Sequence, residues 1–278
     1  MYKINSYAKI NLSLDVLNKR EDGYHNIDTI MQLIELKDII EIEKRNDNLL
    51  NIKCNKSEVP TDKNNLIYKV WDILRKYKEN DHGLNVYIEK NIPVAAGLAG
   101  GSSNAAYFMK KVNEIWNLNL SCEKLMEIGS KIGADIPYFF EEGTVRAEGI
   151  GNKFTKLKNL ENLDILLVNS GCEVSTKYVY DNIKLSKKSN INKLIESINL
   201  GEIFNKSVYY NTMTEVSVTV CPEIKNIIDE MYELGAKISL MSGSGASVFG
   251  IFENESDINR VYEKIKDKYK FVLKTKTI

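Results

Sequence analysis

A run of glycine, alanine and serine at residues 93–106 is the segment best suited to hold an anion. Glycine lets the backbone approach a ligand closely, and successive N–H groups in such a loop form a concavity for phosphate. The run is predicted to open a helix, whose N-terminus carries a partial positive charge. No lysine follows the glycines in the Walker arrangement, so a P-loop NTPase is excluded. Considered alone, the run also fits a strand-to-helix turn capped by serine.

Three other segments carry residues that could do chemistry. Lys9 and Asn11 alternate with apolar residues, so both side chains leave a predicted strand on one face and can point into one site. Asp135 stands where the chain turns out of a predicted helix. Residues 243–245 are a Gly-Ser-Gly turn. A lone strand lysine is commonly solvated, an aspartate often caps a turn, and such a turn often closes a hairpin.

The elements that must position these residues mix strand and helix patterns. Residues 9–16 alternate between apolar and polar types, which predicts a half-buried strand. Further strands are predicted at residues 27–34, 38–43, 84–89, 144–146, 163–169, 237–241, 247–252 and 271–276. Helices are predicted from an Asn64–Asn65 cap to Lys78, from Ser102 to Trp116, from a Ser121 cap to Gly133, from Pro222 to Gly235, from Ser256 to Tyr269, and briefly near Thr176 and Ile191. Strands and helices do not alternate regularly, which favours two α+β domains, at residues 1–152 and 153–278.

Composition narrows the class of protein. Lys plus Arg and Asp plus Glu both number 38, and this balance argues against a nucleic-acid binder. The apolar runs are too short for a membrane span and no secretory segment is visible at the start, so we expect a soluble, cytoplasmic protein without a membrane partner. The four cysteines lie far apart and only two histidines are present, which predicts reduced structural thiols and no zinc site.

Three motifs in order resemble those of the GHMP kinase superfamily: residues 6–12, 93–106 and 241–249. Residues 8–12, 20–25, 97–104 and 133–137 are most similar to the branch that phosphorylates 4-diphosphocytidyl-2-C-methyl-D-erythritol. Ala99 replaces a glycine found in many relatives, and its methyl group is tolerated provided that φ stays below zero.

The resemblance implies an α+β GHMP kinase fold, with a ribosomal-protein-like N-terminal domain, a ferredoxin-like C-terminal domain and an active site in a cleft between them. It implies ATP and Mg²⁺ as cofactors, a small-molecule substrate, and a monomer or weak homodimer. The implied reaction is ATP-dependent phosphorylation of the substrate's 2-hydroxyl in non-mevalonate isoprenoid precursor biosynthesis. The phosphate-binding residues would be Pro93, Val94, Ala95, Ala96, Gly97, Leu98, Ala99, Gly100, Gly101, Ser102 and Ser103.

The resemblance also assigns roles to single residues. Asp135 would take the proton of the acceptor hydroxyl and Lys9 would pair with it. Ser103 is a candidate magnesium ligand. The substrate-binding residues would be Asn11, Tyr24, His25, Thr176, Tyr180, Gly243, Ser244 and Gly245.

In that scheme Tyr24 stacks on the cytosine ring, His25 bonds its polar edge, and Tyr180 lies on the other side. The alternatives are a GHMP kinase of the mevalonate or homoserine type, a non-catalytic nucleotide-binding module, and an RNA-binding α+β domain. A base-free substrate gives the aromatic residues nothing to stack on, and a pure binder has no need of the lysine–aspartate pair.

Overall fold

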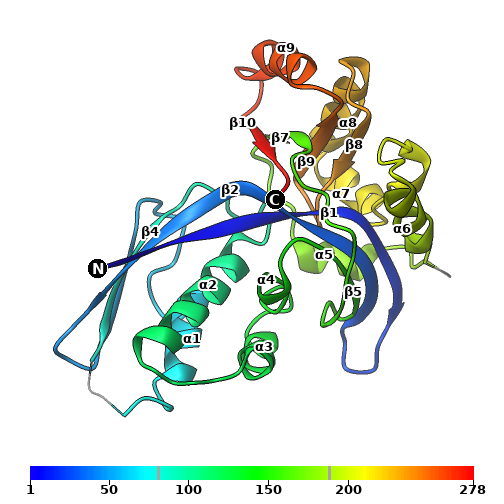
Figure 1. Ribbon diagram of the computed structural model, residues 1–278. Helices are drawn as coiled ribbons and strands as arrows, with labels where there is room; N and C mark the ends of the chain where they lie inside the picture. The colour runs from blue at the N-terminus through cyan, green and yellow to red at the C-terminus, as the bar shows by residue number, and fades with distance from the viewer. Residues whose placement is uncertain (80–81, 187–188) are drawn as a thin grey trace. The chain divides into compact units, whose positions relative to one another are not determined.

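A computed structural model describes residues 1–79, 82–186 and 189–278 and shows the mixture of strands and helices that the sequence predicts (Figure 1). Close contacts divide the chain into two compact units. Unit 1 comprises residues 1–8, 36–94 and 99–141, and unit 2 comprises residues 9–35, 95–98 and 142–278. The first two strands pass through both units, so neither unit is one continuous stretch of chain. The boundary at residue 152 stays a prediction.

Unit 1 packs helices on short strands. Its elements, with the two strands that it shares with unit 2, are β1 (Tyr2–Lys19), β2 (His25–Lys44), β3 (Leu50–Cys54), α1 (Leu66–Leu74), β4 (Leu84–Glu89), α2 (Gly100–Ile115), α3 (Cys122–Ser130) and α4 (Tyr138–Glu141). Strand β3 pairs in parallel with β4, and β4 pairs antiparallel with the C-terminal part of β2. Helix α1 packs against α2, and fully buried Val70, Phe108 and Met109 form part of their core.

Unit 2 contains a four-stranded antiparallel sheet in the order β10-β7-β9-β8. Its further elements are β5 (Thr144–Gly149), β6 (Lys153–Lys156), β7 (Asp164–Asn169), α5 (Thr176–Asn182), α6 (Ile191–Leu200), a 3₁₀ turn η1 (Lys206–Val208), α7 (Thr214–Val220), α8 (Glu223–Glu233), β8 (Ile238–Met241), β9 (Ser247–Phe252), α9 (Glu255–Ile265) and β10 (Phe271–Lys276). Helix α8 packs against β8 and β9, and α9 packs against β7 and β10. The N-terminal part of β2 pairs with β5, which pairs with β6.

Two predicted capping residues, Asn65 and Ser121, start their helices where the sequence placed them. The Asn65 side chain accepts a hydrogen bond from the Ile67 amide at 2.9 Å, and Ser121 accepts one from Lys124 at 3.2 Å. Each bond satisfies an amide that has no partner inside the helix. Helix α1 ends at Leu74, short of the predicted Lys78.

Two strand predictions were wrong in detail. Residues 27–34 and 38–43 were expected as separate strands but form the single strand β2. Residues 9–16 were expected to form a half-buried strand, yet the polar residues Lys9, Asn11, Ser13 and Asp15 are all buried as well. Such burial is tolerated because hydrogen-bond partners replace water. Asp15, for example, accepts bonds from a serine hydroxyl at 2.7 Å and a tyrosine hydroxyl at 2.6 Å.

Within the described residues, no helix combines the length and apolar character that crossing a bilayer requires.

Candidate active site

Parts of the three sequence motifs meet in unit 2, at residues 9–12, 95–98 and 241–249, although they lie far apart in the chain. The loop at residues 95–98 is hydrogen-bonded to β1, because the Lys9 amide donates to the Leu98 carbonyl at 3.2 Å. The same loop is bonded to the third motif, because the Ser242 hydroxyl donates to the Gly97 carbonyl at 3.0 Å. Ser242 also accepts a bond from the Asn11 amide at 3.2 Å, so one serine joins all three segments.

Lys9 is a buried lysine with defined partners. Its side chain is 3% exposed, and its Nζ donates to Asn11 Oδ1 at 2.6 Å and to the Gly97 carbonyl at 3.2 Å. The side-chain nitrogen Nδ2 of Asn11 in turn donates to the Thr29 hydroxyl at 2.9 Å. This bond keeps the side-chain oxygen of Asn11 directed toward Lys9. A buried ammonium is costly without such partners. The solvated-lysine interpretation is therefore wrong, and Asn11 has a direct role in orienting Lys9.

Glycine is required where the loop and the third motif touch. Gly97 has φ +77°, and a Cβ there would overlap the Ser242 carbonyl oxygen. Gly243 has φ +56°, and a Cβ there would lie 3.1 Å from the Gly97 carbonyl oxygen. The side-chain amide of Asn211 donates to the Gly243 carbonyl at 2.8 Å and holds the turn in place. The sequence provided no signal for Asn211.

The end of the glycine-rich run lies in unit 1 and begins α2 at Gly100. Its N-cap is Ala99 with φ 54° and ψ 27°, so the expectation of a negative φ was wrong. Alanine in this left-handed region costs about 1–2 kcal/mol, because its Cβ crowds the following carbonyl oxygen. No side chain caps α2 and no acidic residue stands in its first turn. The first amides therefore remain suited to an anion, and Gly101 beside them is exposed.

The two serines of this turn differ in their surroundings. Ser103 is fully buried, its hydroxyl donates to the Tyr7 carbonyl at 2.6 Å, and it lies 2.7 Å from the Ser6 hydroxyl. Ser102 is only partly buried. Its Oγ would lie 3.7 Å from a Cβ placed on Gly133, which brings it near the segment of Asp135. Ser103 thus anchors α2 to β1, and Ser102 is the serine accessible to a ligand.

The sequence also gave no indication of a buried ion pair behind this turn. Lys90 bonds Asp38, and both side chains are buried. Asp38 also accepts bonds from Asn104 Nδ2 at 2.8 Å and from the Asn91 and Ile92 amides at 2.7 and 2.8 Å. This network ties Asn104 of α2 to the strands that precede the loop. Asp38 begins one predicted strand and Lys90 directly follows another, and nothing in that pattern indicated that the two residues pair.

Asp135 lies in unit 1, in the turn between α3 and α4, and is partly buried. The Ile136 amide donates to the Gly133 carbonyl at 3.1 Å and closes the turn. Lys9 belongs to unit 2, so the predicted pairing of Lys9 with Asp135 stays a prediction.

Two of the three predicted base-binding residues lie together in unit 2. The rings of His25 and Tyr180 stack with centroids 5.0 Å apart and an interplanar angle of 23°. Tyr24 is 59% exposed. Burial lowers the pKa of His25 below its usual value, and nearby Lys19 lowers it further. The imidazole is therefore mostly neutral at pH 7, with one donor and one acceptor nitrogen.

Thr176 opens α5 and lies against the third motif. Its hydroxyl is 2.7 Å from the Ser244 hydroxyl. The Ser217 hydroxyl of α7 donates to the Ser244 carbonyl at 3.0 Å, so two helices hold this turn. The predicted substrate residues Thr176 and Ser244 are thus neighbours.

The remaining predicted residues line the loop. Pro93 is partly buried, Val94 and Ala95 are exposed, and Ala96 is buried. The Ala96 carbonyl accepts a bond from the Ser247 amide at 3.3 Å. Gly245 completes the third motif with φ +91°.

Comparison with known proteins agrees with this arrangement. The family model of the GHMP kinases N terminal domain matches residues 65–143, and that of the GHMP kinases C terminal matches residues 185–270. A Finegoldia magna protein named 4-diphosphocytidyl-2-C-methyl-D-erythritol kinase is 51% identical and covers both chains completely. A protein of the same name from Clostridium perfringens is 43% identical over 99% of this chain and 98% of its own.

Solved structures agree as well. A crystal structure of 4-(cytidine 5'-diphospho)-2C-methyl-D-erythritol kinase superposes with a TM-score of 0.85 at 25% identity over 99% of both chains. The mevalonate kinase of Methanococcus jannaschii, at 19% identity, shares the fold with a TM-score of 0.71 over 100% of this chain and 98% of its own. The chain therefore belongs to the GHMP kinase family, and it is a full-length relative of enzymes named 4-diphosphocytidyl-2-C-methyl-D-erythritol kinase.

Proposed function

We propose that this kinase transfers the γ-phosphate of ATP to the 2-hydroxyl of 4-diphosphocytidyl-2-C-methyl-D-erythritol, in non-mevalonate isoprenoid precursor biosynthesis. The observation that carries the proposal is the single serine, Ser242, that joins the strand of Lys9, the glycine loop and the third motif. The full-length relatives bear the name of this activity. Mevalonate- and homoserine-type activities have no comparable support.

The N-terminus of α2 is the proposed site for the ATP phosphates. Its first turn has neither a side-chain cap nor an acidic residue, and Gly101 leaves its backbone open. Amides at the start of a helix, together with the helix dipole, favour an anion there. Ala99 and Gly100 bring the backbone into position before that turn.

Asp135 is the proposed acceptor of the substrate proton, and Lys9 is its predicted partner. Phosphoryl transfer usually has a loose transition state, in which the attacking hydroxyl loses its proton late. Strong basicity then matters less than position, so a carboxylate close to an ammonium can still serve. Asn11 holds the Lys9 ammonium in place, and that charge offsets the charge that develops on the transferred group.

The substrate base is proposed to bind at the aromatic residues of unit 2. Tyr24 is exposed and offers a face for stacking, which is worth about 1–3 kcal/mol for a nucleic-acid base. His25 and Tyr180 are stacked on each other and form a second wall. Neutral His25 can both donate to and accept from the polar edge of cytosine.

The proposed phosphate site offers few side chains that could bind Mg²⁺ directly. Magnesium usually keeps several waters and takes few protein ligands, while it neutralises charge on the phosphates. Ser103 has its hydroxyl engaged with Tyr7 and is closed to solvent, which disfavours it as a ligand. Partly exposed Ser102 is the better candidate.

The test is phosphate transfer from ATP with Mg²⁺ to the cytidylylated substrate, to mevalonate and to homoserine. Wild type should turn over only the cytidylylated substrate. Asp135→Asn should lower kcat by about 100-fold or more, the usual contribution of a positioned base. Asp229→Asn, which alters an exposed carboxylate on α8, is the matched control and should behave as wild type. Turnover of a base-free substrate would refute the base site, and bound ATP without any transfer would indicate a binding module.

Location in the cytoplasm and a monomeric or weakly dimeric state complete the proposal, and light scattering tests the oligomeric state.

A further inference from the structure

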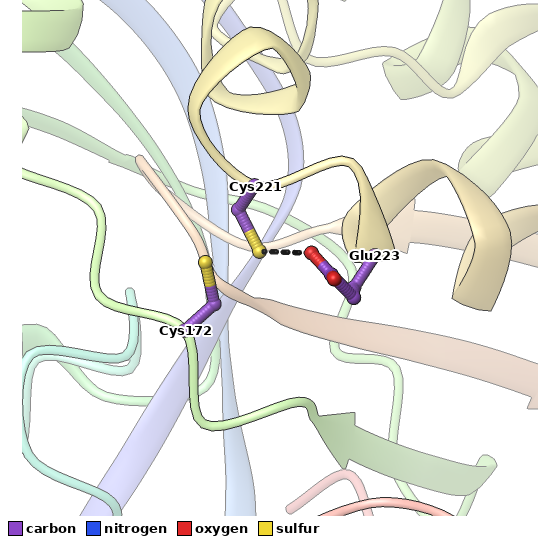
Figure 2. A group of neighbouring side chains, drawn as sticks. All are labelled: Cys172, Cys221 and Glu223. Carbon is purple, nitrogen blue, oxygen red and sulfur yellow. Dashed lines mark hydrogen bonds between the residues drawn. The ribbon is translucent and has the colours of Figure 1, made fainter.

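Three side chains with metal-binding atoms meet in unit 2, apart from the residues discussed above (Figure 2). The sulfur atoms of Cys172 and Cys221 and a carboxylate oxygen of Glu223 all lie within 4.8 Å of one another. The Cys221 sulfur is 3.5 Å from Glu223 Oε2. Cys221 is buried, Cys172 is partly buried and Glu223 is exposed, so the group opens to solvent at its carboxylate.

The backbone holds the two cysteines in short, well-defined segments. Cys172 lies between β7 and α5, and its amide donates to the Ser170 hydroxyl at 3.3 Å. Cys221 ends α7, and its amide donates to the Ser217 carbonyl at 2.9 Å. Glu223 begins α8 two positions later. Figure 2 shows the three side chains pointing toward one another from these separate segments.

We propose that Cys172, Cys221 and Glu223 form a binding site for one zinc ion. Zinc binds thiolate sulfur at about 2.3 Å and carboxylate oxygen at about 2.0–2.2 Å, in a tetrahedron whose ligand atoms lie roughly 3.5–4 Å apart. The three ligand atoms lie within 4.8 Å of one another, so small side-chain movements would bring them to that spacing. Three protein ligands leave the fourth position to water.

The chemistry of the ligands selects the metal. Two thiolates suit zinc or another soft cation, whereas magnesium prefers oxygen ligands alone. Zinc binds thiolates, so a bound zinc ion displaces one proton from each thiol.

The site would link the two supports of the third motif. Cys172 lies in the segment that leads into α5, whose first residue, Thr176, lies against Ser244. Cys221 ends α7, whose Ser217 holds the Ser244 carbonyl. An ion bound to both cysteines therefore joins the segments that position this turn. This proposal departs from the prediction of structural thiols and no zinc site. The sequence did not indicate the site because the two cysteines lie 49 residues apart and form no recognisable zinc motif.

The test is titration of the reduced, chelator-treated full chain with Co²⁺, followed by Zn²⁺. Wild type should bind one Co²⁺ with a sulfur-to-cobalt charge-transfer band, and Zn²⁺ should remove that band and raise the thermal midpoint. Cys172→Ser should lower metal affinity by about 100-fold or more, and exposed Glu223→Gln by roughly tenfold or more. Cys122→Ser, at an exposed cysteine, should leave both signals unchanged.

Two results would overturn the proposal. One is a missing charge-transfer band in wild type, or a band in Cys172→Ser that keeps the wild-type intensity and Co²⁺ affinity. The other is loss of two free thiols with a mass decrease of two hydrogens under dissolved oxygen or peroxide, together with no metal uptake by the reduced chain. That second outcome would identify the pair as a redox-formed disulfide.

Discussion

Gly97→Ala should destabilise the chain strongly, because the added methyl group meets backbone atoms that cannot rotate away. The new Cβ would overlap the Ser242 carbonyl oxygen and lie 3.0 Å from its carbon and 3.2 Å from the Gly245 carbonyl oxygen. Overpacking of this kind costs about 1–3 kcal/mol. The φ of +77° adds about 1–2 kcal/mol for alanine, and a stiffer unfolded chain offsets about 0.4–1 kcal/mol.

The expected net loss in the free energy of unfolding is about 1–5 kcal/mol, and each kcal/mol lowers the thermal midpoint by roughly 2 °C for a chain of this size. Gly201→Ala is the matched control. Gly201 has φ +78°, and no atom lies within 4 Å of the Cβ position. Its variant should therefore lose only the conformational part, about 1 kcal/mol.

Urea and thermal unfolding of both variants measure the difference, and steady-state kinetics measure its effect on the site. Because Gly97 also accepts the Lys9 and Ser242 hydrogen bonds, its displacement should raise the KM for ATP, whereas Gly201→Ala should leave the KM unchanged. Equal losses of stability in the two variants would refute the contact argument, since Gly97 and Gly201 have nearly equal φ angles. An unchanged KM in a destabilised Gly97→Ala variant would separate this turn from ATP binding.

Three further predictions concern other parts of the site. Ala99→Gly should raise the free energy of unfolding by up to about 1 kcal/mol, because relief of left-handed strain exceeds the added chain entropy, whereas Ala105→Gly inside α2 should lower it; a loss in both would contradict the strain. Asp38→Asn should cost about 3–5 kcal/mol in denaturant unfolding, since it leaves a buried lysine without its counter-charge, and a loss below 1 kcal/mol would show that the network relaxes. For His25, whose pKa is lowered, the contribution to stability is intact above the ordinary pKa of 6.5 and falls as pH drops through that value toward the lower folded pKa. An NMR titration, with His82→Gln to assign the two imidazoles, should give a His25 pKa below 6.5, and a higher value would show that burial does not dominate.

Local chemistry in the sequence determined much of the fold. Asn65 and Ser121 mark helix starts because a side-chain oxygen can satisfy an otherwise unpaired amide, and the structure uses both in this way. The α+β class and the family also follow from residue patterns and motifs, and both are confirmed. Such features depend on neighbours in the chain, which the sequence displays directly.

Tertiary contacts decided the rest. Lys9 and Asn11 were predicted to share a strand face that could point into one site, but their alternation with apolar residues fits a solvated face equally well. Only the packing of residues 95–98 and Ser242 against them shows that this face is buried. The positive φ of Ala99 is set by the path of the loop into α2, although alanine disfavours this left-handed conformation. The cysteine pair depends on where two helices begin and end in space. In each case the energy comes from groups far away in sequence, so no local pattern records it.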